Sequence, residues 1–183
     1  MNPAERFVFA PTVEGLVRGV GAQLNGTTKS ELRELGIDLD RPLKPGYPAV
    51  MWHRALEVIA RDVCPGLEAS EAHFRLGSRT VYGLDDTLVG KAMLAMIRLI
   101  GPRRTLLRLP TSAKIGTNFV GLTLTELAPN DFELVSRPFM GYAEVMQGSV
   151  HAVIEISGAP NPRVDIVDYD RTAEQMTLRA KWG

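Results

Sequence analysis

The chain has 183 residues, of which 45% are apolar and 23% charged, and its 21 basic and 21 acidic residues balance. This length and composition suit one folded domain over residues 1–183 and exclude long disordered tails. The single cysteine, Cys64, excludes an intrachain disulfide and a cysteine-based zinc site, which fits a reducing compartment. No secretory signal is visible, and no apolar run approaches the ~20 residues of a membrane span. We therefore expect a cytoplasmic protein.

Basic residues gather in one stretch of the chain. Residues 87–125 contain no acidic residue but six basic ones, which are Lys91, Arg98, Arg103, Arg104, Arg108 and Lys114. Such a stretch can form an anion-binding surface. Alternatively, acidic residues from the flanking segments can fold back beside these bases. The sequence leaves both interpretations open.

The first third of the chain has a helical pattern. A short helix is predicted over residues 13–20, although its two glycines weaken it. Thr28 and Glu31 have the spacing of a capping box, which predicts a second helix that ends at Gly36. A third helix is predicted over residues 48–64, because its apolar residues share one face and its charged residues another.

Two further helices are predicted before the middle of the chain. The first covers residues 69–84, and the second covers residues 87–100 and ends at Gly101. Asp85 or Asp86 is expected to cap the second helix; the same two carboxylates could instead form a catalytic pair, but capping is favoured. Since the helix over residues 87–100 is apolar nearly all round, we expect it to be the buried centre of the domain.

After Gly116 the apolar period changes from helical to alternating. Strands are predicted near residues 120–125, 132–135, 164–166 and 176–182, with a helix over residues 142–156 between the second and third. Pro129-Asn130 predicts a hairpin. The fold class is therefore α+β, with a helical N-terminal half (about residues 11–115) packed on a four-stranded antiparallel sheet formed by a β-β-α-β-β C-terminal half (about residues 117–182).

Few residues suggest chemistry. The three histidines, His53, His73 and His151, lie on different predicted helices and form no metal-ligand pair, so we expect neither a metal nor a cofactor. His53 or His73 as an axial haem ligand is the alternative. Cys64 fits a small buried residue better than a reactive thiol.

The segment Gly101-Pro-Arg-Arg-Thr105 is the strongest candidate for a polar site. Arg103 and Arg104 stand at a helix start, where free N–H groups attract phosphate or carboxylate. Arginines in such a turn can instead pair with acidic residues such as Asp38 or Asp40. No phosphate-binding loop, dinucleotide fingerprint or serine elbow occurs, and the basic stretch lacks the aromatic residues of nucleic-acid sites. We therefore expect no enzyme and no nucleic-acid partner.

Several segments carry a family resemblance. They are VEGL from Val13, ELGIDLDRPLKPGYP from Glu34 to Pro48, FRLG from Phe74, TLVGKAMLAMIRLIGPRRTL from Thr87 to Leu106, and NFVGLTLTEL from Asn118 to Leu127. Over about Phe7 to Trp182 the chain resembles the myxobacterial paralogous family of unknown function, a resemblance that implies no activity.

The order of elements is also similar to 4-vinyl reductase domains, to haem nitric-oxide-binding domains and to one class of trafficking-complex subunits. These relatives bind small hydrophobic molecules or serve as dimeric assembly pieces. The haem domains carry a Tyr-x-Ser-x-Arg motif and an axial histidine, and the vinyl reductases often carry a cysteine cluster. This sequence lacks the motif and the cluster, so the similarity implies fold rather than function.

Two functional hypotheses follow. The first is a sensory or regulatory domain, not an enzyme, that binds a small hydrophobic or anionic ligand, with Arg103, Arg104, Met93, Met96 and Met146 as the candidate ligand-binding residues. It predicts a cavity between helices 87–100 and 142–156 and the sheet. The second is a protein-interaction or scaffold domain, dimeric and without a ligand, which predicts an exposed apolar patch.

Overall fold

The computed structural model describes residues 2, 5–139 and 141–183. Its helices are α1 (Ala10–Val20), α2 (Gly26–Glu34), α3 (Ala49–Val63), α4 (Ala69–Tyr82), α5 (Leu88–Gly116) and α6 (Ala143–Ile156), with short 3₁₀ turns η2 (Gly21–Gln23) and η3 (Gly83–Asp86). Its strands are β1 (Phe7–Phe9), β2 (Gly46–Pro48), β3 (Leu122–Ala128), β4 (Asp131–Ser136), β5 (Arg163–Asp170) and β6 (Gln175–Lys181). The predicted α+β class and the β-β-α-β-β order of the second half are confirmed.

The four-stranded sheet has the order β3-β4-β6-β5, and every neighbouring pair is antiparallel. The predicted hairpin joins β3 to β4, with Asn130 in the left-handed region at φ 61°. Alternation along β4 and β6 buries Phe132, Leu134 and Leu178 on one face. The ring of Trp182 stacks on Phe132 at 5.5 Å and closes this core near the end of β6.

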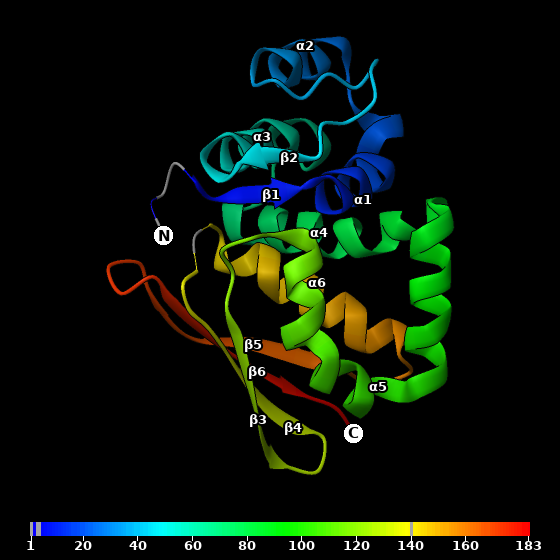
Figure 1. Cartoon of the computed structure of the whole chain (residues 1–183), viewed down its shortest axis with the longest axis vertical. Helices are drawn as coiled ribbons and strands as arrows, with labels where there is room; N and C mark the ends of the chain where they lie inside the picture. Colours follow the sequence, from blue (N-terminus) through cyan, green and yellow to red (C-terminus); the bar gives the residue numbers. More distant parts are fainter. Residues whose placement is uncertain (1, 3–4, 140) are drawn as a thin grey trace.

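Helix α6 lies between the sheet and α4, so the middle of the molecule has three layers (Figure 1). The buried residues of α6 are spread around the helix, and they are Ala143, Gly148, Val150, Ala152 and Ile154. This distribution arises because one side of α6 covers the sheet while the other contacts α4.

Helices α1, α2 and α3 form a further layer on the other side of α4, beside a two-stranded sheet of β1 and β2 that the sequence pattern did not predict. Their core includes Leu16, Leu32, Leu56 and Ile59. Helix α2 begins earlier than predicted. Its cap is Asn25, whose side-chain oxygen accepts a hydrogen bond from the backbone N–H of Thr28 at 2.9 Å.

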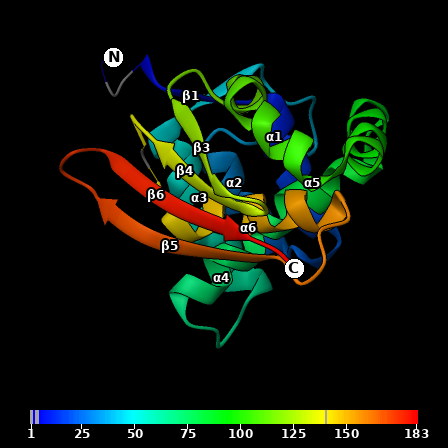
Figure 2. The same ribbon diagram turned by 90° about the horizontal axis from the view of Figure 1, so that it is seen from below.

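Helix α5 consists of two segments that meet at a kink. Gly101 has φ 78° and interrupts the helical backbone, as the predicted helix end there requires. Thr87, not Asp85 or Asp86, caps the first segment, because its hydroxyl oxygen accepts a hydrogen bond from Gly90 N–H at 2.9 Å. The second segment returns across the sheet and buries Leu106 against it (Figures 1 and 2).

The prediction that the helix over residues 87–100 is the buried centre of the domain is wrong. Both views place the first segment of α5 at the edge of the molecule (Figures 1 and 2). Leu94 and Ile97 are buried, but Leu88 and Leu99 are 87% and 86% exposed. An apolar surface on all sides of a helix therefore does not mean burial on all sides here. Within the residues described, no helix is both long and apolar enough to cross a bilayer.

Candidate functional site

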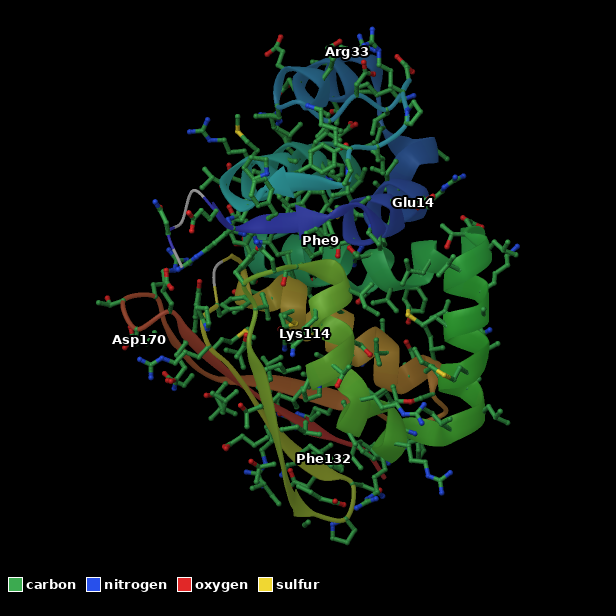
Figure 3. All side chains as sticks on the ribbon, in the orientation of Figure 1. Phe9, Glu14, Arg33, Lys114, Phe132 and Asp170 are labelled. Atoms are coloured by element: carbon green, nitrogen blue, oxygen red, sulfur yellow. The ribbon has the colours of Figure 1, made fainter. Side chains whose placement is uncertain are left out.

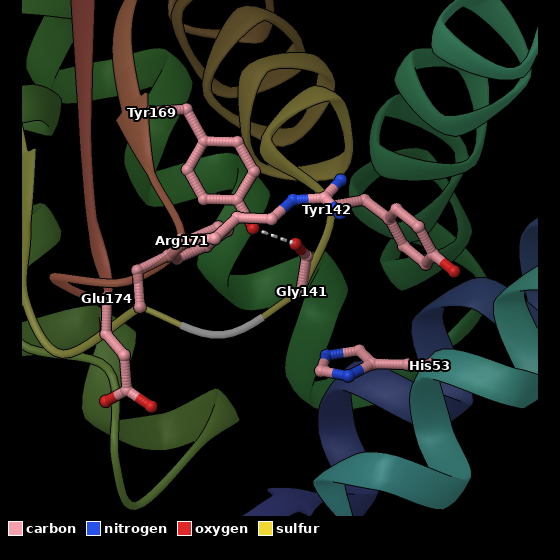
Figure 4. A pocket seen from close by; sticks show the side chains of 7 residues that line it. His53, Gly141, Tyr142, Tyr169, Arg171 and Glu174 are labelled. Atoms are coloured by element: carbon pink, nitrogen blue, oxygen red, sulfur yellow. Dashed lines mark hydrogen bonds between the residues drawn. The ribbon is translucent and has the colours of Figure 1, made fainter.

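A cleft of about 280 Å³ opens where α3, the start of α6 and the turn between β5 and β6 come together (Figure 4). Its lining residues are His53, Phe139, Gly141, Tyr142, Tyr169, Arg171 and Glu174, and we call it the Tyr142 cleft. These residues come from three separate parts of the sequence. The fold therefore brings together an aromatic and charged surface that no local sequence motif predicts.

Tyr142 stands at the centre of the aromatic part of this cleft. Its hydroxyl donates a hydrogen bond to Glu57, and its ring stacks on His73 with 3.8 Å between ring centres and 23° between planes. The ring of His53 meets Tyr142 edge-on at 6.1 Å. Burial, together with the neighbouring Glu57 carboxylate, raises the pKa of Tyr142 to about 12. The phenol is therefore protonated and neutral at physiological pH.

His73 links the cleft to α4. The residue is only 8% exposed, and this burial lowers its pKa, although the carboxylates of Glu144 and Glu57 act in the opposite direction. A neutral imidazole stacks on a phenol ring without burying a charge. This pair therefore fixes the start of α6 against α4.

Tyr169 and Arg171 form the wall of the cleft on the sheet side (Figure 4). The Tyr169 hydroxyl donates to the carbonyl oxygen of Gly141 at 2.6 Å, and burial raises its pKa. The Arg171 guanidinium lies 5.5 Å from the centre of the Tyr169 ring, a cation–π arrangement. Among the described residues Arg171 makes no ion pair. Arg171 thus offers a positive charge that a ligand can reach.

Glu174 is held by a partner 168 residues away in the sequence. Both of its carboxylate oxygens accept hydrogen bonds from Arg6, each at 2.7 Å, and Arg6 is only 4% exposed. The hydrogen bonds from Arg6 lower the pKa of Glu174. The guanidinium of Arg6 also lies 5.9 Å from the ring centre of Phe119. This ion pair ties the β5–β6 turn to the N-terminal layer.

A second cavity of about 400 Å³ lies where β1, the end of α5 and the start of β3 meet. Its lining residues are Phe9, Lys114, Thr117, Asn118, Phe119, Val120 and Gly121; Figure 3 labels Phe9 and Lys114. Asn118 has a structural role here. Its side chain accepts from Phe7 N–H at 2.8 Å and donates to the Glu5 carbonyl at 2.9 Å.

The structure does not bring Arg103 and Arg104 to either of these cavities. Arg103 forms a bidentate ion pair with Glu126, at 2.9 and 2.6 Å, which raises the pKa of Arg103 and lowers that of Glu126. The suggested partners Asp38 and Asp40 lie beside Arg33 instead. Arg104 is exposed. An acidic residue from a flanking segment thus meets one arginine of the basic stretch.

The candidate methionines also lie apart from the two cavities. Met93 packs against the cluster of Leu94 and Ile97, whereas Met146 packs against the core of the sheet. Met96 is 45% exposed, and its sulfur accepts a hydrogen bond from the Arg108 guanidinium at 3.6 Å. The three methionines thus have three different surroundings. Ligand binding by these residues therefore remains a prediction.

Two further candidate residues, Cys64 and His151, have surroundings typical of residues that stabilise the fold. Cys64 is buried. His151 meets the ring of Phe74 edge-on at 5.5 Å. In the part of the chain that the structure describes, no group of three histidine, cysteine, aspartate or glutamate residues is placed to hold a metal ion. The residues that sequence reasoning missed are Tyr142, Tyr169, Arg171 and Glu174, for which spacing gives no signal.

Comparison with known proteins identifies the fold. An H-NOX protein solved in a study of the mechanism of H-NOX activation aligns with a TM-score of 0.64 at 14% identity, over 96% of this chain and 96% of its own. An Fe(II) unliganded H-NOX protein from K. algicida gives a TM-score of 0.65 at 9% identity, with 94% of this chain and 95% of its own covered.

A third structure, an oxygen-binding H-NOX domain related to soluble guanylate cyclases, aligns with a TM-score of 0.61 at 11% identity, over 93% of this chain and 92% of its own. At such identities the likeness shows the fold alone, and it confirms the looser similarity expected from the order of elements.

The comparison at the sequence level gives the family. No curated protein matches the chain. The family described as protein of unknown function (DUF2378) matches residues 6–182, nearly the same span over which the sequence motifs carry their resemblance. The chain belongs to this DUF2378 family.

Proposed function

We propose that the chain is a small-molecule-binding domain and that the Tyr142 cleft takes a small organic anion, such as a carboxylate with a flat apolar body. The observation that carries the proposal is Arg171, a guanidinium without an ion-pair partner among the described residues, placed over an aromatic wall. An arginine in a partly enclosed site is a strong, geometrically specific partner for carboxylate and phosphate groups.

The other groups of the cleft favour a flat ligand body. The hydroxyls of Tyr142 and Tyr169 are occupied by Glu57 and by the Gly141 carbonyl, so what these tyrosines offer is ring surface. Ring faces and edges pack well against flat apolar groups. The cleft volume of about 280 Å³ lies just below the range of typical ligand pockets, roughly 300–1,000 Å³. The ligand class is therefore a small metabolite.

A regulatory role would follow from the position of the cleft. A ligand that contacts both Arg171 and Tyr142 would connect the β5–β6 turn to the start of α6. Tyr142 in turn stacks on His73 of α4, so the bound state would reach the helical layers through direct contacts. Such a ligand biases any equilibrium in which these two segments move relative to each other.

Haem, whose distortion in the H-NOX family is the subject of another aligned structure, does not fit the described residues. An axial ligand must face an open slot. His73 has its ring face against Tyr142 and lines neither cavity described above. His53 faces a cleft that also carries Arg171 and Glu174. Helices α4 and α6 touch through their backbones at Gly77 and Gly148, so no slot opens at this crossing.

The test is a ligand screen on the purified chain. Thermal shift with small carboxylates and phosphates, followed by calorimetry on the best binder, is expected to show saturable stabilisation that Arg171→Gln removes. Arg163→Gln is the matched control, because Arg163 is an exposed arginine at the start of β5, the strand that Arg171 follows, and pairs with Asp165. The proposal fails if no anion stabilises the wild type, or if Arg171→Gln binds the selected anion as tightly.

Native mass spectrometry gives a second, independent readout. A mass adduct that disappears on denaturation would identify a molecule retained from the cell, and its loss in Arg171→Gln would place it in the Tyr142 cleft. An adduct of equal occupancy in both proteins would contradict the cleft as its site.

The protein-interaction hypothesis is favoured by a different observation, the apolar side chains that the first segment of α5 leaves exposed to solvent.

A further inference from the structure

The first segment of α5 exposes a continuous apolar face to solvent. Leu88, Val89 and Leu99 are 87%, 81% and 86% exposed, and Met96 is 45% exposed. Ala92 and Ala95 lie between them and are exposed as well. We call these six residues the outer face of α5. Large apolar side chains exposed singly are ordinary, but a contiguous patch of them marks a binding surface.

The opposite side of the same segment already packs against the molecule. Gly90, Leu94 and Ile97 are buried, and a Cβ on Gly90 would stand 2.1 Å from the Leu84 carbonyl oxygen. The outer face therefore cannot turn inward without removing these contacts. The described chain has no element of its own left to cover it, since the segment lies at the edge of the molecule (Figure 2).

We propose that the outer face of α5 binds the same face of a second copy of this chain, as an antiparallel pair of helices. The sequence spacing favours self-pairing. Leu88, Ala92, Ala95 and Leu99 follow one another at intervals of four, three and four residues, the seam of a coiled coil. The order of residues and of intervals is the same from either end of the seam. A two-fold axis near its centre places leucine opposite leucine and alanine opposite alanine, as an isologous interface requires.

Side-chain size fits this arrangement. The small residues Ala92 and Ala95 occupy the middle of the seam, where two helices can approach closely, while Leu88 and Leu99 close its two ends. On one flank Val89 of one copy lies beside Met96 of the other, which widens the apolar contact. The two identical faces are therefore complementary in shape.

Charge on the second flank weakens this pairing. This flank carries Lys91 and Arg98, which approach Arg98 and Lys91 of the second copy when the helices run antiparallel. Asp85 lies 3.9 Å from Arg98 and reduces the repulsion. The face is about 18 Å long and covers less than the ~800 Å² per partner of a standard interface. We therefore expect a dimer that dissociates on dilution.

The first experiment measures the oligomeric state. Sedimentation velocity over a concentration series is expected to show the wild-type chain pass from monomer to dimer, and Leu99→Asp to raise the dissociation constant by at least tenfold. Because Leu99 is 86% exposed, the circular dichroism of Leu99→Asp should match the wild type. Val167→Asp, on β5 and 57% exposed, is the matched control and should dimerise like the wild type.

The second experiment tests the antiparallel register. Cys64 is the single native cysteine and is buried, so introduced thiols report alone. An oxidised mixture of Ala92→Cys and Ala95→Cys proteins should yield more disulfide dimer than either protein by itself, and Thr123→Cys, exposed on β3, should yield none. A wild type that stays monomeric, or a Leu99→Asp variant that dimerises normally, overturns the proposal. More dimer from Ala92→Cys alone than from the mixture overturns the antiparallel register.

Discussion

Gly77 of α4 and Gly148 of α6 face each other's helices in direct backbone contact. A Cβ on Gly77 would stand 2.0 Å from the carbonyl oxygen of Val145, and a Cβ on Gly148 would stand 2.0 Å from that of Phe74. The next residue on each helix strengthens the crossing. Ser78 Oγ donates to the Gly148 carbonyl and Ser149 Oγ donates to the Gly77 carbonyl, each at 3.1 Å.

Alanine at either glycine is expected to destabilise the protein. A Gly→Ala substitution inside a helix normally raises the free energy of unfolding by up to ~1 kcal/mol. Here the added methyl meets backbone that cannot move aside, and overpacking of this kind costs about 1–3 kcal/mol or more. We expect Gly77→Ala and Gly148→Ala each to lower the free energy of unfolding by about 1–3 kcal/mol, measured by urea denaturation.

Gly26→Ala is the matched control for this prediction. Gly26 begins α2 and has no neighbouring atom within 4 Å of the added Cβ. We expect its unfolding free energy to change by less than ~0.5 kcal/mol. If Gly77→Ala were as stable as Gly26→Ala, the close crossing of α4 and α6 would be wrong.

Capping of α5 gives a second prediction. The Thr87 hydroxyl oxygen accepts a hydrogen bond from Gly90 N–H. Thr87→Ala is therefore expected to lower the unfolding free energy by about 1 kcal/mol. Asp86→Ala, one position earlier in η3, should change it by less than ~0.5 kcal/mol. Thermal unfolding of the two variants side by side separates the observed cap from the one that the sequence favoured. Equal losses would mean that Asp86 also caps the helix.

Local patterns predicted the strands and most helix positions well, because alternation and periodicity depend on near neighbours. They failed where the outcome depends on distant segments. Gly15 and Gly19 seemed only to weaken α1 in sequence terms. In the structure a Cβ at these positions would lie 2.4 and 2.3 Å from carbonyl oxygens of Thr80 and Arg79, so the same glycines allow α1 to touch α4. The periodicity of one segment carries no information about such a contact with a distant segment.

The Tyr142 cleft was beyond sequence reasoning for a related reason. Arg6 and Glu174 are 168 positions apart. Arg171 and Tyr142 line the same cleft although they come from separate elements of the fold. Likewise, the composition of α5 could not distinguish a helix buried on all sides from one with an apolar face left open. The place of Gly101 in α5 was predicted correctly, because its conformational role is local.

Acid should destabilise the protein through Asp131. Hydrogen bonds from Arg179 and Lys181 lower the pKa of Asp131 from 3.8 to about 2. Since the unfolded state then binds more protons, this stabilisation is present above about pH 4 and is lost as pH falls towards 2. We expect the unfolding free energy of Asp131→Asn to fall less steeply than that of the wild type between about pH 4 and pH 2.

Asp168→Asn is the control for acid unfolding, because it removes an exposed carboxylate on β5 that makes no ion pair among the described residues. It should keep the wild-type slope in denaturation curves recorded between about pH 5 and pH 2. A wild-type slope in Asp131→Asn as well would contradict the role of this carboxylate.

Alkaline pH should act through two tyrosines. Burial, followed by hydrogen bonds to Glu155 and Glu57, raises the pKa of Tyr82 and of Tyr142 from 10.0 to about 12. The folded state keeps these protons longer, so the stabilisation is present below about pH 10 and is lost as pH rises towards 12. We expect Tyr82→Phe and Tyr142→Phe each to reduce the alkaline loss of stability.

Tyrosinate absorbance provides the measurement for this prediction. In the folded protein, either Phe substitution should remove amplitude from the upper part of the titration and leave the part below about pH 11 unchanged. Amplitude lost near pH 10 in Tyr142→Phe would show that its phenol is solvated and not bonded to Glu57.

The order β3-β4-β6-β5 has a consequence for biosynthesis. Strand β6 separates β4 from β5, although β5 is made before it. Until residues 175–181 have left the ribosome and folded, the hairpin of β3 and β4 keeps an unpaired inner edge and β5 has no strand neighbour. Nascent chains therefore carry unpaired strand edges, which favour aggregation, until β6 pairs with both strands.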